Sequence, residues 1–146
     1  MKSEPTEYSI DHLAHDGRSS WFGVRNYLAR NYMRDQMQVG DQIFFYHSSC
    51  PIPGIVGIAT VVSLAHPDET QFDPKSTYFD PKATREKPIW YCIDVGFIEK
   101  FERTLSITEI RTHETLKNMK ILERGNRLSI TPVSSIEANF ILQLFH

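Results

Sequence analysis

One aromatic side chain and several polar side chains lie near the two ends of a single stretch, residues 21–49. Trp21 and Asn26 flank the expected start of a helix, and His47 and Ser48 follow the end of an expected strand. A site for a nucleobase needs an aromatic wall for stacking and a few fixed polar groups for the edge of the base. Asn26 can offer both a donor and an acceptor to such an edge. These residues predict a base-binding pocket in which Trp21 is the wall.

Two further aromatic residues, Tyr27 and Tyr46, are candidates to extend this wall, and Arg25 lies close to them in the sequence. Stacking on such rings is worth about 1–3 kcal/mol per base. The same residues also have a plain structural interpretation. In it Trp21 packs the helix start, Asn26 caps the helix and Arg25 forms a salt bridge. The residues alone support both interpretations equally.

The most basic segment of the chain is 117–127, which contains Lys117, Lys120, Arg124 and Arg127. Gly125-Asn126, between the two arginines, favours a tight reversal. The arginines could clamp the phosphates on either side of a captured base. A solvated turn with one arginine bound to a carboxylate explains the pattern equally well.

Metal binding and nucleophilic catalysis are poorly supported. The six histidines are scattered, and His12 and His15 have no carboxylate or thiolate partner at a recognisable spacing. Ser48, Ser49 and Cys50 follow His47 without a nucleophile-elbow motif. We therefore expect no metal, no cofactor and no catalytic residue.

A helix and a buried strand must position the candidate residues. Residues 25–37 contain no Gly or Pro. The helical period places five residues on one broad buried face: Leu28, Ala29, Tyr32, Met33 and Met37. Gly40-Asp41 ends this helix, and residues 43–46 form an apolar strand.

The rest of the chain predicts strands separated by turns, with helices at the margins. Strands are expected at 55–64, 89–98 and 128–130, and Gly57 is expected at a bulge or a close backbone approach. Helices are expected after the capping residues Ser9, Ser106 and Ser134, with a further short helix that includes Leu116 and Met119. This pattern predicts a small α+β protein built on a mixed β-barrel.

Residues 65–88 form a long polar loop in this prediction, and loops of that length are often functional. Within it, Phe72-Asp73-Pro74-Lys75 returns as Phe79-Asp80-Pro81-Lys82. Two similar turns, each anchored by an aromatic side chain, explain this repeat better than a ligand-binding role does.

Composition and charge limit the class of protein. The 146 residues are 40% hydrophobic and 23% charged, which predicts one globular domain over residues 1–146. No apolar run reaches the roughly 20 residues of a membrane helix, and the start lacks a signal region. Two isolated cysteines indicate a reducing compartment, so we expect a cytoplasmic monomer without a membrane partner. The net charge of −2 argues against a protein that coats duplex nucleic acid, but it permits capture of one base.

Several segments of the sequence resemble the EVE domain family of the PUA-like superfamily. They are KSEP, WFGVRNYLARNYMRD, VGDQIFFYHSSCPIPGIVGIATV, QFDPKSTYFDPK, PIWYCIDV and RGNRLSITPV. The resemblance covers nearly the whole chain and implies a PUA-like bent β-barrel with peripheral helices. It also implies a pocket near Trp21 that recognises modified bases in DNA or RNA. The family usually carries an aromatic-rich strand before KSEP, so either the native start lies upstream or the barrel is less complete here.

We therefore predict a non-enzymatic reader of one modified nucleobase, such as a methylated or hydroxymethylated cytosine in DNA or RNA. The candidate base-binding residues are Ser3, Trp21, Arg25, Asn26, Tyr27, Tyr46, His47 and Ser48, and the candidate backbone-binding residues are Lys117, Lys120, Arg124 and Arg127. Two alternatives remain. One is a small hydrolase of a modified nucleoside that uses Lys2 and Glu4. The other is a protein-interaction module that uses the 65–88 loop.

Overall fold

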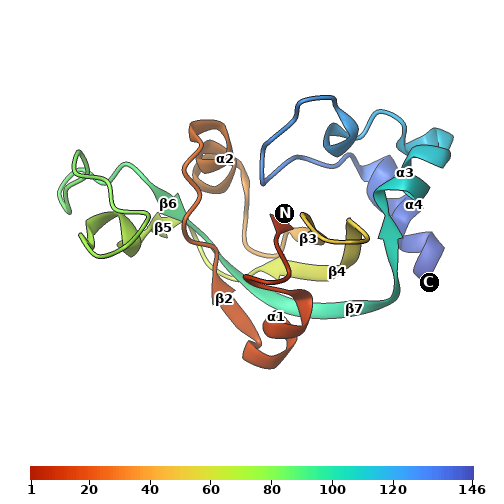
Figure 1. Ribbon diagram of the computed structural model, residues 1–146, viewed down its shortest axis with the longest axis horizontal. Coiled ribbons are helices and arrows are strands. Elements are labelled where there is room, and N and C mark those ends of the chain that lie inside the picture. Colours follow the sequence, from red (N-terminus) through yellow and green to blue (C-terminus); the bar gives the residue numbers. More distant parts are fainter.

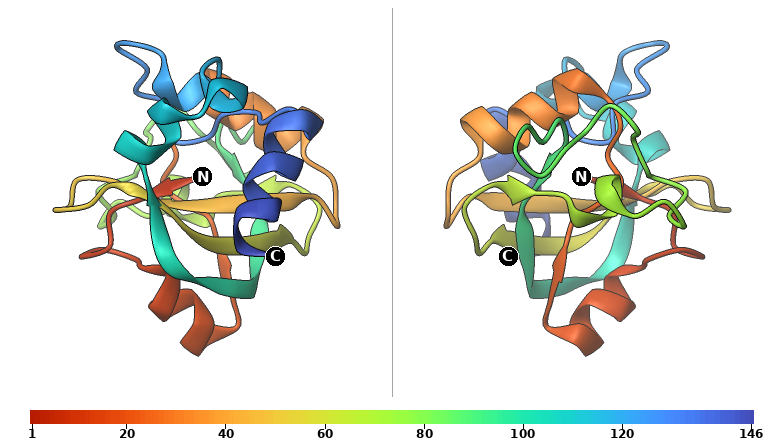
Figure 2. Two further views of the ribbon diagram at one scale, coloured as in Figure 1. Left: turned by 90° about the vertical axis from the view of Figure 1, so that its right-hand side faces the viewer. Right: turned by 90° about the vertical axis from the view of Figure 1, so that its left-hand side faces the viewer.

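A curled five-stranded sheet is the frame of the protein (Figures 1 and 2), and the computed structural model describes all 146 residues. Its strands are β1 (Lys2–Ser3), β2 (Arg18–Ser20), β3 (Gln42–His47), β4 (Gly54–Val61) and β7 (Asp94–Ser106). They lie in the order β1-β3-β4-β7-β2, with β1 parallel to β3 and every other pair antiparallel. A small separate sheet pairs β5 (His66–Pro67) with β6 (Tyr91–Cys92).

Helices cover the margins of this half-barrel. They are α1 (Ile10–Asp16), α2 (Tyr27–Asn31) with a following π-helical turn (Tyr32–Gln36), α3 (Ile107–Thr112) and α4 (Ser135–Phe145), with 3-10 turns at Glu69–Phe72, Glu114–Leu116 and Lys120–Leu122. The helix α1 lies on one side of the sheet, and the segments from α3 to α4 lie on the opposite side (Figure 2). The 65–90 segment projects as a lobe at the other end of the molecule from α3 and α4 (Figure 1).

Two glycines let β4 and β7 approach closely enough for the sheet to bend. A Cβ atom at Gly54 would lie 2.3 Å from the carbonyl oxygen of Leu105, and one at Gly57 would lie 2.3 Å from that of Glu99. The register of β4 against β7 shifts on both sides of Gly57. Such irregularities increase strand twist and curvature. The close backbone approach predicted at Gly57 is confirmed.

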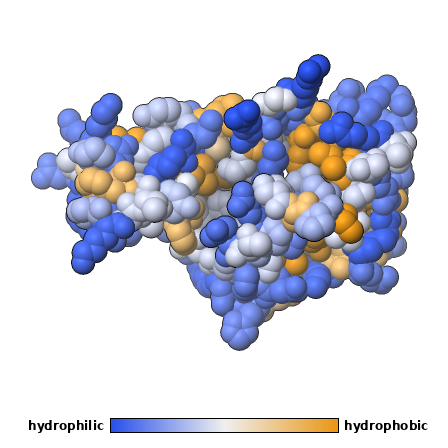
Figure 3. Space-filling model, in the orientation of Figure 1, coloured by the Kyte–Doolittle hydropathy of each residue, from blue (hydrophilic) through white to orange (hydrophobic).

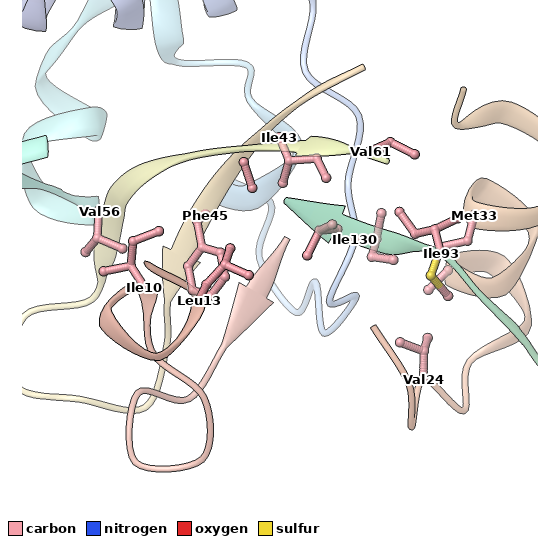
Figure 4. Packing of buried hydrophobic residues seen from close by; sticks show 13 residues of the cluster. Ile10, Leu13, Val24, Met33, Ile43, Phe45, Val56, Val61, Ile93 and Ile130 are labelled. Carbon is pink, nitrogen blue, oxygen red and sulfur yellow. The ribbon is translucent and has the colours of Figure 1, made fainter. Parts of the chain in front are cut away.

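Neighbouring residues of β3 point into two different cores. Phe45 belongs to a cluster with α1 and α2 (Figure 4), whereas Tyr46 belongs to a second cluster beneath α3 and α4. This is the alternation that a strand imposes on successive side chains. Trp21 packs against the Phe45 cluster, so the two faces of β3 separate Trp21 from Tyr46.

The three predicted N-cap residues are confirmed, but the capping box predicted for Ser106 and Glu109 is not formed. Ser9 and Ser134 each form a full capping box, and Gly17 ends α1 with φ of 79°. Ser106 caps α3 through the Glu109 backbone N–H. The Glu109 carboxylate binds Arg103 and does not return to the cap.

The predicted helix over residues 25–37 was wrong in its bounds and in part of its face. The helix α2 begins only after Asn26 and widens into a π-helical turn from Tyr32. Ala29 and Met33 are fully buried, as predicted, but Leu28 is 48% exposed because its side chain lies near the 124–128 turn rather than the core. The periodicity located the buried stripe correctly but made it too wide.

Four other predicted elements differ in the structure. The strand over 89–98 is divided into β6 and β7, and β7 continues to Ser106. Residues 128–130 form no strand, although the Ser129 carbonyl accepts from the Lys2 N–H and Ile130 is buried in the core. The 65–88 loop contains β5 and a 3-10 turn. Leu116 ends one 3-10 turn and Met119 precedes the next, so the two residues do not share a helix.

The α+β class and the bent half-barrel with peripheral helices are confirmed. None of its helices has the length and apolar character needed to span a membrane.

Candidate functional site

Trp21 is held by the core and still offers a polar edge to solvent. Its ring packs edge-on against Phe45, with centroids 5.5 Å apart, and its backbone N–H donates to the carbonyl of Ile93. The indole side chain is only partly buried. Its N–H has no partner in the protein and is not sealed from solvent. A fixed ring with a free donor is suited to a flat polar ligand.

His47 continues the same row of rings but is committed to the fold. Its ring lies 5.8 Å from that of Phe45, and its Nε2 atom accepts from the Ile10 backbone N–H at 3.0 Å. An accepting Nε2 places the ring proton on Nδ1. Burial lowers the pKa of His47, and nearby Asp11 and Lys100 act in opposite directions on it. His47 therefore anchors the start of α1 as a neutral ring.

This arrangement predicts a loss of stability in acid. Since the folded-state pKa of His47 lies below its ordinary value of 6.5, the unfolded chain takes up the proton first as the pH falls. The free energy of unfolding should therefore decrease as the pH falls from above 6.5 towards the lowered pKa. Urea titrations on both sides of that value, for the wild type and for His47→Gln, measure this. Glutamine can accept the Ile10 N–H without titrating, so an identical pH dependence in both proteins would contradict the assignment.

Asn26 caps α2, and this role fixes what it can offer to a ligand. Its Oδ1 atom accepts from the backbone N–H groups of Leu28 and Ala29, at 2.9 and 3.1 Å. The Nδ2 group has no partner, and the residue is exposed. The prediction that Asn26 supplies both a donor and an acceptor was wrong, because the cap uses the acceptor. Asn26 can offer donors only.

Arg25 has no free donor for a ligand. Its five N–H groups make five hydrogen bonds to four groups: the Tyr78 carbonyl (twice), the Val24 carbonyl, the Asp68 carboxylate and the Thr70 hydroxyl. A guanidinium group has five such donors in total. Arg25 therefore fastens the 65–88 loop to the segment before α2. Its predicted direct contact with a base is not compatible with this geometry.

The Asp68 carboxylate completes this connection. It is 1% exposed, and it accepts hydrogen bonds from Arg25, Thr70 and the Gly23 N–H. Burial alone would raise its pKa, but the hydrogen bonds from Thr70, Gly23 and Arg25 outweigh burial and hold the pKa below its usual range. Asp68 is therefore a buried anion that joins the loop to Arg25.

Neither candidate tyrosine lies beside Trp21. Tyr27 stacks on Trp90 at 4.9 Å with Arg30 above it, on the side of α2 that faces the loop. Tyr46 is 4% exposed and lies on the opposite face of β3 from Phe45. The prediction that these two rings extend the Trp21 wall is wrong for that reason.

Ser3 and Ser48 meet at the edge of the sheet. Ser3 pairs in register with His47, and its carbonyl accepts from the Ser48 N–H at 2.9 Å. The Ser3 hydroxyl donates to the Tyr8 carbonyl at 2.6 Å. Its oxygen can still accept a hydrogen bond. Ser3 is thus close to His47 and chemically available.

The basic 117–127 segment divides into paired and unpaired cations. Lys117 is bound to Glu114 and Lys120 to Glu123. Arg124 and Arg127 are exposed and have no acidic partner. The turn between them is tight, with Gly125 at φ of 75°. Of the four cations in this segment, only Arg124 and Arg127 are free to bind phosphates.

Two cavities adjoin this segment, and they share Tyr32, Thr131 and Pro132. One of about 410 Å³ lies between the arginine turn and α2, and one of about 490 Å³ lies between β3, the 119–133 segment and α4. Tyr46 lines the larger one. Trp21, Asn26 and His47 line neither of these two cavities.

The structure brings Cys92, His66 and Asp94 together, an arrangement typical of a nucleophilic site that the sequence did not indicate. The Cys92 sulfur lies 3.6 Å from Nδ1 of His66, whose Nε2 is 2.8 Å from Asp94. Burial raises the pKa of the Cys92 thiol to about 12, so the thiolate that catalysis needs is not formed near neutral pH. These residues are 26 and 28 positions apart, and only the pairing of β5 with β6 brings His66 beside Cys92.

The comparisons with known proteins agree with this fold. The family model "EVE domain" matches residues 1–144. The chain is 41% identical to thymocyte nuclear protein 1 of Gallus gallus and 37% identical to that of Homo sapiens, with 99% of this chain aligned in each case. It spans 66% and 72% of the lengths of those two relatives.

Solved structures match over the same extent. A protein from Pseudomonas syringae is 46% identical with a TM-score of 0.94, covering 100% of this chain and 97% of that one. Human THYN1 protein, in complex with 5-methylcytosine-containing DNA, is 37% identical with a TM-score of 0.91, covering 99% and 94%.

The relatives' names correct the expected location. They are thymocyte nuclear proteins, and this finding overturns the cytoplasmic location expected from the sequence. The expectation rested on two isolated cysteines and the lack of a signal region, and a nuclear protein shares both properties.

Proposed function

The chain belongs to the EVE domain family, and from that premise we propose that it is a non-enzymatic module that binds DNA by capturing a modified cytosine. The observation that carries this proposal is its likeness to the human protein crystallised with 5-methylcytosine-containing DNA. Trp21 is the stacking wall, and Asn26 and Ser3 are the groups that meet the edge of the base.

The hydrogen-bonding groups at Asn26 and Ser3 are complementary to cytosine. Its pairing edge offers two acceptors, N3 and O2, and one amino donor. The free Nδ2 group of Asn26 supplies N–H donors for the acceptors. The Ser3 oxygen is an acceptor for the amino group. His47 and Ser48 support Ser3 from the adjacent strand.

Arg124 and Arg127 are the contacts to the nucleic-acid backbone in this proposal, because they lack acidic partners. Phosphate contacts position a protein on its ligand without reading sequence. Two such contacts suit a protein whose net charge is −2, since a larger electrostatic footprint would need a basic surface. The affinity therefore depends mainly on the captured base.

Titration with matched oligonucleotides tests the proposal. Burial of one methyl group is worth about 0.8 kcal/mol, so we expect 5-methylcytosine to be preferred over cytosine about fourfold or more. Equal binding of both oligonucleotides, or no binding of either, would refute the proposal. The Cys92 thiol, whose pKa is about 12, supports a binding function over nucleophilic catalysis.

Asn26 can be tested separately from its capping role. Asn26→Ser keeps a side-chain oxygen that caps a helix but removes the amide donors, so stability should stay nearly constant while affinity falls about tenfold. Asn26→Ala should lose the same affinity and also about 1 kcal/mol of stability, because it removes the cap. Binding and thermal unfolding of the three proteins measure both effects. Wild-type affinity in Asn26→Ser would show that the amide does not touch the base.

Three further expectations belong to this proposal: the module acts as a monomer, residues 1–146 form a single domain, and RNA with a modified base is a second ligand. Size-exclusion chromatography tests the first, and limited proteolysis tests the second. Titration with matched RNA oligonucleotides tests the third.

A further inference from the structure

Phe22, which follows Trp21 in the sequence, forms an exposed aromatic pair with Tyr78. Phe22 is 54% exposed and Tyr78 is 39% exposed. Their ring centroids are 6.1 Å apart at an interplanar angle of 70°. Single exposed aromatic residues are common on protein surfaces, but a contacting pair next to a candidate site needs an explanation.

The backbone holds Tyr78 in place rather than leaving it on a loose loop. Gly23 has φ of 83°, and a Cβ atom there would lie 2.7 Å from the Tyr78 ring, so the ring rests directly on this glycine. The Tyr78 carbonyl accepts two hydrogen bonds from Arg25, at 2.7 and 3.1 Å. The pair is therefore preorganised, which lowers the entropic cost of binding.

The rest of the lobe is also well anchored. The amide of Gln71, 0% exposed, makes four hydrogen bonds to the backbone at Asp68, Ile89 and Trp90. Asp80 accepts from the Trp90 indole at 2.8 Å. The space-filling view shows that the lobe projects beyond the barrel and is mainly hydrophilic, with a few hydrophobic residues at its surface (Figure 3).

Three lysines of the lobe are available to a phosphate group. Lys75, Lys82 and Lys87 are exposed and form no salt bridge. Among the acidic residues of the lobe, Asp68 and Glu69 are paired with arginines, Asp80 accepts from the Trp90 indole, and Asp73 and Glu86 form no salt bridge. Exposed rings next to unpaired lysines are the combination that binds single-stranded nucleic acid.

We infer that Phe22 and Tyr78 form a stacking platform for an unpaired nucleobase adjacent to the captured base, with the lobe lysines near its phosphates. This inference rests on the proposed function and extends it from one nucleotide to at least two. Stacking accepts any base, so the platform adds affinity without adding sequence preference. Trp21 would select the modified base, and the platform would strengthen binding to the strand that carries it.

Abasic substitution tests the platform. The probes are short single-stranded DNAs with a central 5-methylcytosine, whose neighbouring nucleotides are normal in one probe and abasic in the other. Wild-type affinity should fall roughly 5- to 150-fold on the abasic probe, the value of one stacked base. Phe22→Ala should bind the normal probe more weakly by a similar factor and should be nearly insensitive to abasic neighbours. Phe22→Tyr should behave like the wild type.

Two controls separate the possible outcomes. Ile52→Ala removes an equally exposed hydrophobic side chain, 63% exposed on the β3–β4 hairpin, and should change neither probe. Every variant should keep its preference for 5-methylcytosine over cytosine, because Trp21 is intact. If Phe22→Ala remains as sensitive to abasic neighbours as the wild type, the platform is refuted while the proposed function stands. If the wild type shows no preference for the modified base, the proposed function is refuted, and the platform with it.

Discussion

Trp21→Ala is expected to weaken binding to 5-methylcytosine-containing DNA roughly 5- to 150-fold, which corresponds to the loss of about 1–3 kcal/mol of stacking. The preference for the methylated base should also shrink, because the methyl group would lose the apolar surface beside it. The effect should be large because the ring is already fixed edge-on against Phe45, at 5.5 Å. A fixed ring loses little entropy when it binds a base. Fluorescence or calorimetric titration of paired oligonucleotides measures both quantities.

Trp21→Phe is the matched control for this prediction. It keeps an aromatic face of smaller area, so it should retain most of the stacking and therefore most of the affinity. Because Trp21 is partly buried, Trp21→Ala must first be shown to be folded at the temperature of the titration. If folded Trp21→Ala binds like the wild type, the base is held elsewhere and Trp21 is only a packing residue.

Gln71→Leu is expected to have the largest effect on stability, a loss of about 3–5 kcal/mol. Leucine has a similar size, but it would leave the backbone N–H groups of Ile89 and Trp90 without their acceptor. The carbonyls of Asp68 and Trp90 would each lose one donor and keep one backbone N–H. The site is 0% exposed, so water cannot readily replace the amide. Denaturant unfolding measures the loss.

Gln38→Leu is the control at an exposed position, where the same substitution should change stability by no more than about 0.5 kcal/mol. Gln71→Leu should also weaken binding to oligonucleotides, because the loop that carries Tyr78 would lose its internal support. A Gln71→Leu protein as stable as the wild type would mean that the four hydrogen bonds contribute little net stability.

Local signals in the sequence predicted local structure well. Ser9 and Ser134 each face a residue three positions ahead, so a short segment determines the cap, and both caps are present. The continuous apolar runs at 43–46 and 55–64 correctly predicted β3 and β4 as buried strands. Gly57 was predictable because only a missing side chain permits the approach of Glu99.

Long-range contacts determine most of the candidate site, and they were not predictable from spacing. Arg25 makes four hydrogen bonds to residues 43–53 positions away and a fifth to Val24, which together use all of its N–H donors. Asn26 was recognised as a possible cap, but the sequence could not show that capping would consume its acceptor. The opposite faces of β3 exclude Tyr46 from the site, although Tyr46 is adjacent in sequence to His47.

The Phe-Asp-Pro-Lys motif occurs twice within the 65–88 loop, and this repeat indicated two similar turns. In both copies the aspartate accepts from the backbone N–H two residues later, at Lys75 and at Lys82, each at 2.9 Å. The two similar turns that the repeat predicted are therefore confirmed. The repeat gave no indication that Tyr78, between the two copies, would lie against Gly23.

Arg25 donates two hydrogen bonds to the backbone carbonyl of Tyr78 and none to the Tyr78 side chain. These two hydrogen bonds would therefore survive an exchange of the ring for another side chain, whereas the packing of the ring on Gly23 and Arg25 would be lost. The backbone contacts at position 78 therefore do not depend on which side chain the residue carries. Tryptophan, histidine and arginine variants at that position should therefore give proteins with the same base site but different affinities for the neighbouring nucleotide.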